Sequence, residues 1–91
     1  MRLDIFLKLS RLIPRRPLAK RFAAAGLIEV NGRKAKASHV VAEGDSIKLI
    51  RHDRIKTVNV LKVPKDKQVS KKDAGGLYEL ESEEILEQDP F

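Results

Sequence analysis

The hydrophobic periodicity of the chain changes from helical to extended at Gly26, and no other sequence feature constrains the fold as strongly. Before Gly26, apolar residues recur at helical spacing, whereas after it short apolar runs alternate with turn-forming residues. This order of elements favours an α+β fold, in which helices cover one face of an antiparallel sheet. We therefore expect two N-terminal helices packed on a small, mostly antiparallel sheet.

Proline and glycine set the expected ends of the two helices. Residues 3–13 place apolar side chains around most of a helical wheel, and Pro14 disfavours helical backbone at the preceding residue. The first helix is therefore expected over residues 3–13. Pro17 suits the first turn of a second helix, which is expected to end at Gly26. The side of the second helix expected to face the core carries Leu18, Ala19, Phe22 and Ala25.

An Asn-Gly pair predicts a β-hairpin directly after the helices. Asn31-Gly32 separates residues 27–30 from residues 33–36, and this dipeptide favours a type I′ turn. Two further strands are expected, over residues 46–51 and 55–63, because turn-forming residues precede both segments.

The C-terminal third is predicted to lie outside the main domain. Residues 64–73 are rich in lysine and aspartate without a periodic pattern, which is typical of a linker. Gly75-Gly76 then opens an acidic segment. We expect one domain over residues 1–63, including a strand extension, and a linker with a less ordered acidic C-terminal tail over residues 64–91.

Charge is unevenly distributed along the chain. The sequence carries 19 Lys and Arg against 13 Asp and Glu, a net charge of +6. Residues 1–36 contribute +8 and residues 37–69 contribute +3, whereas residues 70–91 contribute −5. This separation indicates a polyanion, above all a nucleic acid, as the partner of the first third of the chain.

Several other functions find no support in the sequence. Cysteine is absent, and His39 and His52 stand alone, so we expect no catalytic, cofactor-binding or metal-binding residues. The longest apolar run, residues 22–28, is far shorter than the roughly 20 residues needed to span a bilayer. These observations, with a motif-bearing N-terminus at Arg2, predict a mature cytoplasmic protein that does not cross a membrane.

Basic residues concentrate around the start of the second helix. Arg15 and Arg16 precede its first turn, where free backbone N–H groups also attract anions, and Lys20 follows Arg16 by one turn. Lys8 and Arg11 of the first helix extend this basic face. Aromatic residues are few, so recognition is expected to depend on phosphate, ribose and shape, which suits structured RNA and also a DNA-binding helix-turn-helix.

An ordered series of motifs resembles the RNA-binding domain named after small-subunit ribosomal protein S-four, also called the αL motif. The resemblance covers about residues 1–51. The matching residues are Arg2-Leu3-Asp4, Phe6-Leu7, Ser10-Arg11-Leu12, Arg15-Arg16, Ala19, Gly26, Val30-Asn31-Gly32, Lys36 and Gly44-Asp45. Pro17 departs from the Ser or Thr of many members, which removes a capping side chain worth about 1 kcal/mol.

Within this family, the chain is most similar to free-standing bacterial members that act in ribosome-associated quality control. The resemblance implies a noncatalytic factor that binds an obstructed large ribosomal subunit, contacting its RNA and the peptidyl-tRNA. It also implies support for alanine tailing of stalled nascent chains by an RqcH-type factor. We do not expect the protein to bind DNA. We expect it to be a monomer.

The resemblance carries site residues onto this sequence. Asp4 is expected to orient its basic neighbours. The expected RNA contacts are Arg2, Lys8, Arg11, Arg15, Arg16, Lys20, Lys34 and Lys36. Three other hypotheses remain open: a recycling factor that moves stalled peptidyl-tRNA, as a more distant likeness to the small S-four heat-shock protein suggests; a helix-turn-helix DNA regulator; and a detached appendage of a modification enzyme.

Overall fold

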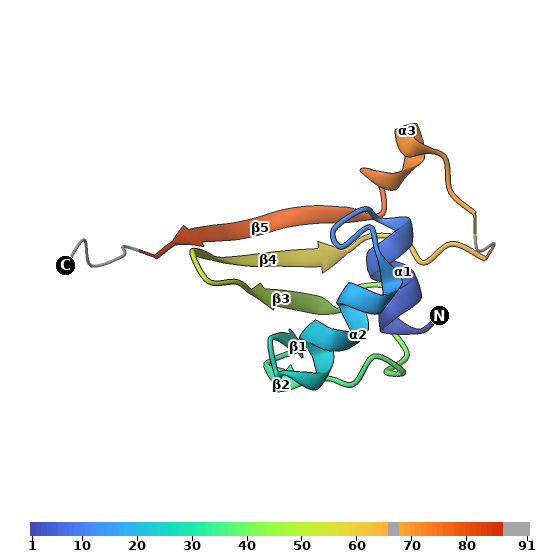
Figure 1. Cartoon of the computed structure of the whole chain (residues 1–91). Coiled ribbons are helices and arrows are strands. Elements are labelled where there is room, and N and C mark those ends of the chain that lie inside the picture. Colours follow the sequence, from blue (N-terminus) through green and yellow to red (C-terminus); the bar gives the residue numbers. More distant parts are fainter. Residues whose placement is uncertain (66–67, 87–91) are drawn as a thin grey trace.

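The computed structural model describes residues 1–65 and 68–86 as three helices and one five-stranded sheet (Figure 1). The helices are α1 (Leu3–Leu9), α2 (Arg16–Ala24) and α3 (Lys71–Ala74). The strands are β1 (Ile28–Val30), β2 (Arg33–Lys34), β3 (Ser46–Ile50), β4 (Arg54–Val60) and β5 (Tyr78–Ile85). The order of elements confirms the predicted α+β fold.

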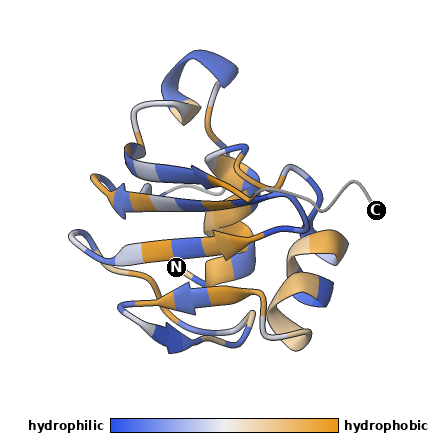
Figure 2. Cartoon of the chain, turned by 90° about the vertical axis from the view of Figure 1, so that its left-hand side faces the viewer, coloured by the Kyte–Doolittle hydropathy of each residue, from blue (hydrophilic) through white to orange (hydrophobic). Residues whose placement is uncertain are grey.

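All strand pairs are antiparallel, and the strand order is β2-β1-β3-β4-β5. Hydrophilic and hydrophobic residues alternate along the strands (Figure 2). In β3, for example, Ile47 and Leu49 are buried whereas Lys48 between them is half-buried, so Lys48 lies on the opposite face of the sheet. The buried face packs with Leu3, Phe6 and Leu7 of α1 into one core.

Helix α1 ends earlier than Pro14 predicts. Its C-cap is Ser10, and Arg11 takes a left-handed conformation with a φ of 66°. The Ser10 hydroxyl donates to the carbonyl oxygen of Leu7, whose oxygen also accepts from the N–H of Ile13 at 3.1 Å. The predicted end at residue 13 was wrong because these bonds to the Leu7 carbonyl oxygen close the last turn at Ser10, four residues before Pro14.

Helix α2 begins and ends close to the predicted residues. Arg15 is its N-cap without a side-chain capping bond, and Gly26 follows the helix with a φ of 75°, as predicted. The expected buried side was partly wrong. Ala19 is buried and Phe22 packs at the core edge, whereas Leu18 and Ala25 are exposed, because this short helix covers only one end of the sheet.

The Asn-Gly hairpin has the predicted turn geometry. Asn31 and Gly32 both have positive φ values, 53° and 83°, which is the signature of a type I′ turn. The Asn31 side chain also ties the turn to β3, donating to Asp45 Oδ1 at 3.1 Å and accepting from the N–H of Ser46 at 2.9 Å. Strand β4 ends at residue 60 and not at residue 63.

The predicted acidic tail is largely a strand. Residues 78–85 form β5, which pairs with β4 from Val60–Tyr78 to Arg54–Ile85, and Leu77 before it is buried in the core. Glu83 of β5 lies 3.8 Å from the Lys56 ammonium, so the acidic strand complements the basic β4. Every residue of β5 after Tyr78 is exposed, so the segment lacks the alternation of buried and exposed residues that would have revealed the strand. The remaining part of the predicted tail, residues 87–91, lies outside the described residues.

Segment 64–73, predicted as a linker, carries the one-turn helix α3 at its end. Ser70 caps this helix by accepting from the N–H of Asp73 at 3.2 Å. In Figure 1, α1 and α2 lie at one end of the molecule, while β4 and β5 extend past them toward the opposite end. No helix among the described residues is long and apolar enough to cross a membrane.

Candidate nucleic-acid interface

A buried carboxylate joins two of the predicted RNA contacts. The Asp4 side chain is fully buried in α1 and accepts from Arg16 Nε at 2.9 Å and from Arg2 Nε at 3.1 Å. The N–H of Ile5 donates to the same carboxylate at 2.9 Å. We call these three residues, Asp4, Arg2 and Arg16, the Asp4 cluster. Both arginine side chains in it remain partly exposed, Arg2 by 43% and Arg16 by 39%.

The backbone of both arginines is held by regular structure, independently of their side-chain bonds to Asp4. Arg2 forms an isolated antiparallel bridge with Val40, and the N–H of Leu3 donates to the carbonyl oxygen of His39 at 2.7 Å. Arg16 is the first residue of α2. The Asp4 cluster therefore connects the N-terminal segment, α1 and α2, although its arginines lie 14 positions apart in the sequence.

The Asp4 carboxylate stays charged despite its burial. Burial alone would raise the pKa of Asp4, but the hydrogen bonds and charges of Arg16 and Arg2 outweigh it, so the pKa is lowered from its ordinary value of 3.8. The ionised carboxylate in turn holds both guanidinium groups in place, leaving their other N–H donors available to a ligand.

Beside the Asp4 cluster, a groove collects four basic side chains between α1 and α2. We call it the Arg16 groove; its lining residues are Lys8, Pro14, Arg15, Arg16, Pro17, Leu18 and Arg21. The groove thus places cations from α1 and α2 around the N-terminal end of α2, whose first turn has no side-chain cap. Cations and free backbone N–H groups at one place make a binding site for phosphate.

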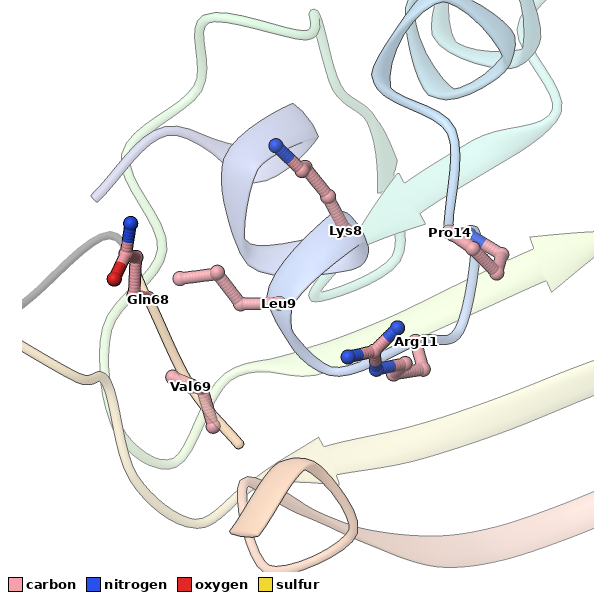
Figure 3. Close-up of a pocket in the computed structure, with 6 residues that line it drawn as sticks. All are labelled: Lys8, Leu9, Arg11, Pro14, Gln68 and Val69. Carbon is pink, nitrogen blue, oxygen red and sulfur yellow. The ribbon is translucent and has the colours of Figure 1, made fainter. Parts of the chain in front are cut away.

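Lys8 and Pro14 also line a second, neighbouring hollow, here called the Arg11 hollow (Figure 3). Arg11, Leu9, Gln68 and Val69 complete its lining. Four of the eight predicted RNA contacts therefore line one of these two concave surfaces: Lys8, Arg11, Arg15 and Arg16.

The other predicted contacts lie elsewhere. Lys20 is exposed on α2 but does not line the Arg16 groove, to which α2 contributes Arg16 and Arg21 as its basic residues. Lys34 reaches Gly26 at the C-terminal end of α2, where a cation complements the helix dipole. Lys36 is exposed in the loop after β2.

The sequence did not predict two basic residues near this surface, Arg21 and Arg51. Arg21 lines the Arg16 groove, and its spacing of one turn from Pro17 could have revealed it. Arg51 donates to the carbonyl oxygen of Leu12 at 3.3 Å and so braces the turn after α1. No local sequence signal links Arg51 to that turn, since the two residues lie 39 positions apart.

Comparisons with known proteins show the family of the chain. Residues 1–47 match the S4 domain family. The RQC P-site tRNA stabilizing factor of Halalkalibacterium halodurans is 48% identical over 94% of this chain and 96% of that protein. The protein of the same name from Bacillus subtilis is 45% identical, over 94% and 98%. The trimeric structure of Vibrio cholerae Heat Shock Protein 15 has a TM-score of 0.77 and 32% identity, over 88% of this chain and 80% of that one.

The fold, the Asp4 cluster and the domain match define a small S4-domain protein, which confirms the resemblance found in the sequence. Within the S4-domain proteins, the chain is 48% and 45% identical to two RQC P-site tRNA stabilizing factors over nearly its whole length. The chain belongs to the family of RQC P-site tRNA stabilizing factors, RqcP.

Proposed function

We propose that the chain is a noncatalytic RNA-binding factor of ribosome-associated quality control in the bacterial cytoplasm. Its ligand is an obstructed large ribosomal subunit that carries peptidyl-tRNA, and it contacts both the ribosomal RNA and the tRNA. Membership in a family whose relatives are named P-site tRNA stabilizing factors supports this proposal. The net charge of +8 in residues 1–36 supports a polyanionic ligand at the helical end of the molecule.

The Asp4 cluster is the single observation that carries the mechanism. Because Asp4 holds Arg2 and Arg16 in place, less side-chain entropy is lost when the guanidinium groups bind phosphate. Arg15, Arg21 and Lys8 then surround a phosphate backbone that passes through the Arg16 groove. Contacts of this basic helical face with phosphates of both the ribosomal RNA and the tRNA hold the tRNA in position on the subunit.

A held tRNA keeps its nascent chain available for elongation. In this proposal, the RqcH-type factor delivers alanyl-tRNA to the same subunit and extends the stalled chain with a C-terminal alanine tail. The small S4 protein supplies no reacting group and acts by position alone.

The test is gradient sedimentation of tagged variants at physiological salt from cells with induced translational stalling. The native chain should sediment with large subunits that carry peptidyl-tRNA. Arg16→Ala and Arg15→Ala should each move most of the protein to the top of the gradient. Lys48→Ala removes the same charge from the opposite face of the sheet and should sediment like the native chain. The Arg15 side chain makes no hydrogen bond or ion pair with the described residues, so its loss tests binding apart from folding.

A second candidate function is recycling, in which the protein binds the same particle to move stalled peptidyl-tRNA. The structural similarity to Heat Shock Protein 15 favours it. Deletion of the gene separates the two: loss of alanine tails supports the tailing role, whereas intact tails with accumulated peptidyl-tRNA support recycling. If the native chain stays at the top of the gradient, or binds duplex DNA more tightly than ribosomal RNA in matched salt, both proposals fail.

A further inference from the structure

The Arg11 hollow has the chemistry of a site for a nucleobase, which is distinct from the phosphate-binding chemistry of the Arg16 groove. Its volume of about 370 Å³ falls in the range of roughly 300–1,000 Å³ typical of small-molecule sites. Leu9, which is almost fully buried, and Val69, which is half-buried, supply apolar groups to a lining that is otherwise largely polar. In Figure 3, Leu9 extends toward Gln68 and Val69, while Arg11 lies between Leu9 and Pro14.

The side chains around the hollow match three parts of a nucleotide. The Arg11 guanidinium is planar and can stack on a base, as arginine does with unstacked RNA bases. The Gln68 amide carries a donor and an acceptor, the pair that glutamine uses to recognise adenine. Lys8 lines both the Arg11 hollow and the Arg16 groove, so its side chain lies between the place of the base and the place of the adjoining phosphate backbone.

The backbone of Arg11 supports a role for its side chain in binding. Arg11 has a φ of 66°, a conformation that glycine adopts without the steric cost of a Cβ atom. Glycine is also the usual residue at this position after a helix. Within residues 1–65 and 68–86, no hydrogen bond or ion pair uses the Arg11 guanidinium. The arginine side chain therefore contributes little to folding at this position. A ligand in the hollow, in contrast, would be bound by its guanidinium group.

We propose that the Arg11 hollow binds one unstacked RNA base, with adenine preferred, while the Arg16 groove holds the adjoining backbone. This proposal rests on the proposed RNA-binding function and adds to it a direct contact with a base. It makes Gln68, from a segment far along the chain, a determinant of which RNA nucleotide the protein accepts. Phosphate contacts alone would give no such preference.

The test uses three RNA hairpins that differ at one position: a bulged adenosine, an abasic residue in its place, and no bulge. The full-length native chain should bind the bulged adenosine about tenfold more tightly than the abasic hairpin, the effect of stacking one base. Gln68→Ala should lower this ratio, because the base loses its hydrogen-bond partner but still stacks on Arg11, without changing affinity for the unbulged hairpin. Lys48→Ala should keep the ratio.

Arg11→Gly separates binding from folding. It should also abolish the preference for the bulged adenosine, while its Tm stays the same or rises by a few degrees, because glycine fits the φ of 66°. A clear fall in Tm would mean that Arg11 serves the fold and would overturn the proposal. Equal binding of the bulged and abasic hairpins by the native chain would overturn it as well.

The outcomes keep this proposal distinct from the proposed function. A native chain that sediments with large subunits but shows no preference among the hairpins retains the RNA-binding function and loses the base site. A native chain that binds neither subunits nor any hairpin loses both.

Discussion

Asp4 has no exposed side-chain surface, yet it remains ionised because two guanidinium groups and one backbone N–H surround its oxygens. An aspartate in the first turn of α1 also lies at the positive end of the helix dipole. One side chain thus stabilises the junction of three segments and sets the direction of two arginines. Changes at Asp4 should therefore affect folding and RNA binding together.

Asp4→Asn should lower the free energy of unfolding by about 1.5–3 kcal/mol, the range for hydrogen bonds that involve a charged group. The neutral amide cannot accept from both arginines as strongly as the carboxylate does. Urea denaturation at pH 7 measures this difference. Asp53→Asn is the matched control, because Asp53 pairs with Arg54 at 3.2 Å but is half-exposed, and only a small effect is expected. Equal losses in both variants would contradict the importance of the buried pair.

The stability of the protein should fall in acid. Because the pKa of Asp4 is lower in the folded chain than its ordinary value of 3.8, the unfolded chain takes up a proton at higher pH than the folded chain. The contribution of Asp4 is therefore complete above about pH 4 to 5 and is lost as the pH falls through the folded pKa. Urea denaturation from pH 7 to pH 2 should show the native chain and Asp4→Asn converging in acid. A constant difference at all pH values would show that the charge of Asp4 does not stabilise the fold.

Among the elements, β5 differs most from the sequence prediction, because the segment expected to be an acidic tail is a strand of the sheet. The N–H of Leu61 donates to the carbonyl oxygen of Leu77 at 2.9 Å, and Leu77 is 4% exposed. Arg54 and Lys56 of β4 face Glu83 of β5 at 4.0 and 3.8 Å. The acidic segment therefore covers an edge of the sheet that would otherwise expose unpaired backbone groups and positive charge.

Leu77→Ala should lower the free energy of unfolding by about 2–5 kcal/mol, because it removes a buried leucine from the core. Leu80→Ala, on a residue of β5 that is 51% exposed, should change it by less than about 0.5 kcal/mol. Thermal and urea denaturation of both variants measure the difference. If Leu77→Ala proved as mild as Leu80→Ala, residues 77–85 would not be part of the cooperative fold.

At the scale of the whole molecule, the two signs of charge are separated. The Asp4 cluster and the Arg16 groove lie with α1 and α2, whereas strand β5, which carries four glutamates, extends away from the helices (Figure 1). A phosphate-rich surface would attract the helical end and repel the strand end. The protein should therefore approach RNA with α1 and α2 facing it.

Binding to large subunits should weaken steeply as salt rises. Each phosphate contact contributes a slope of roughly 0.7–0.9 in the logarithm of the association constant against the logarithm of salt concentration. Arg15→Ala should reduce the slope of the native chain by about one such contact, and Lys48→Ala should leave it unchanged. A titration from low to physiological salt with purified subunits checks this. A slope that Arg15→Ala does not change would place Arg15 outside the contact.

Local signals predicted much of the fold and part of the site. Gly26 and Asn31-Gly32 take the backbone conformations expected of them, since their preferences depend on sterics within a few residues. The basic character of residues 1–36 was equally visible. The early end of α1 was not, because the bond between Ile13 and Leu7 competes with further helix only once the chain has turned.

The sequence by itself determined the order of helices and strands, the hairpin turn, the family and the charge of the binding end, because propensity, periodicity and charge are properties of neighbouring residues. Only the tertiary structure decided that Asp4 joins Arg2 to Arg16, that Arg21 enters the groove in place of Lys20, and that the acidic segment is a strand. These features depend on contacts between distant residues. Their energies exist only after the chain has brought the partners together.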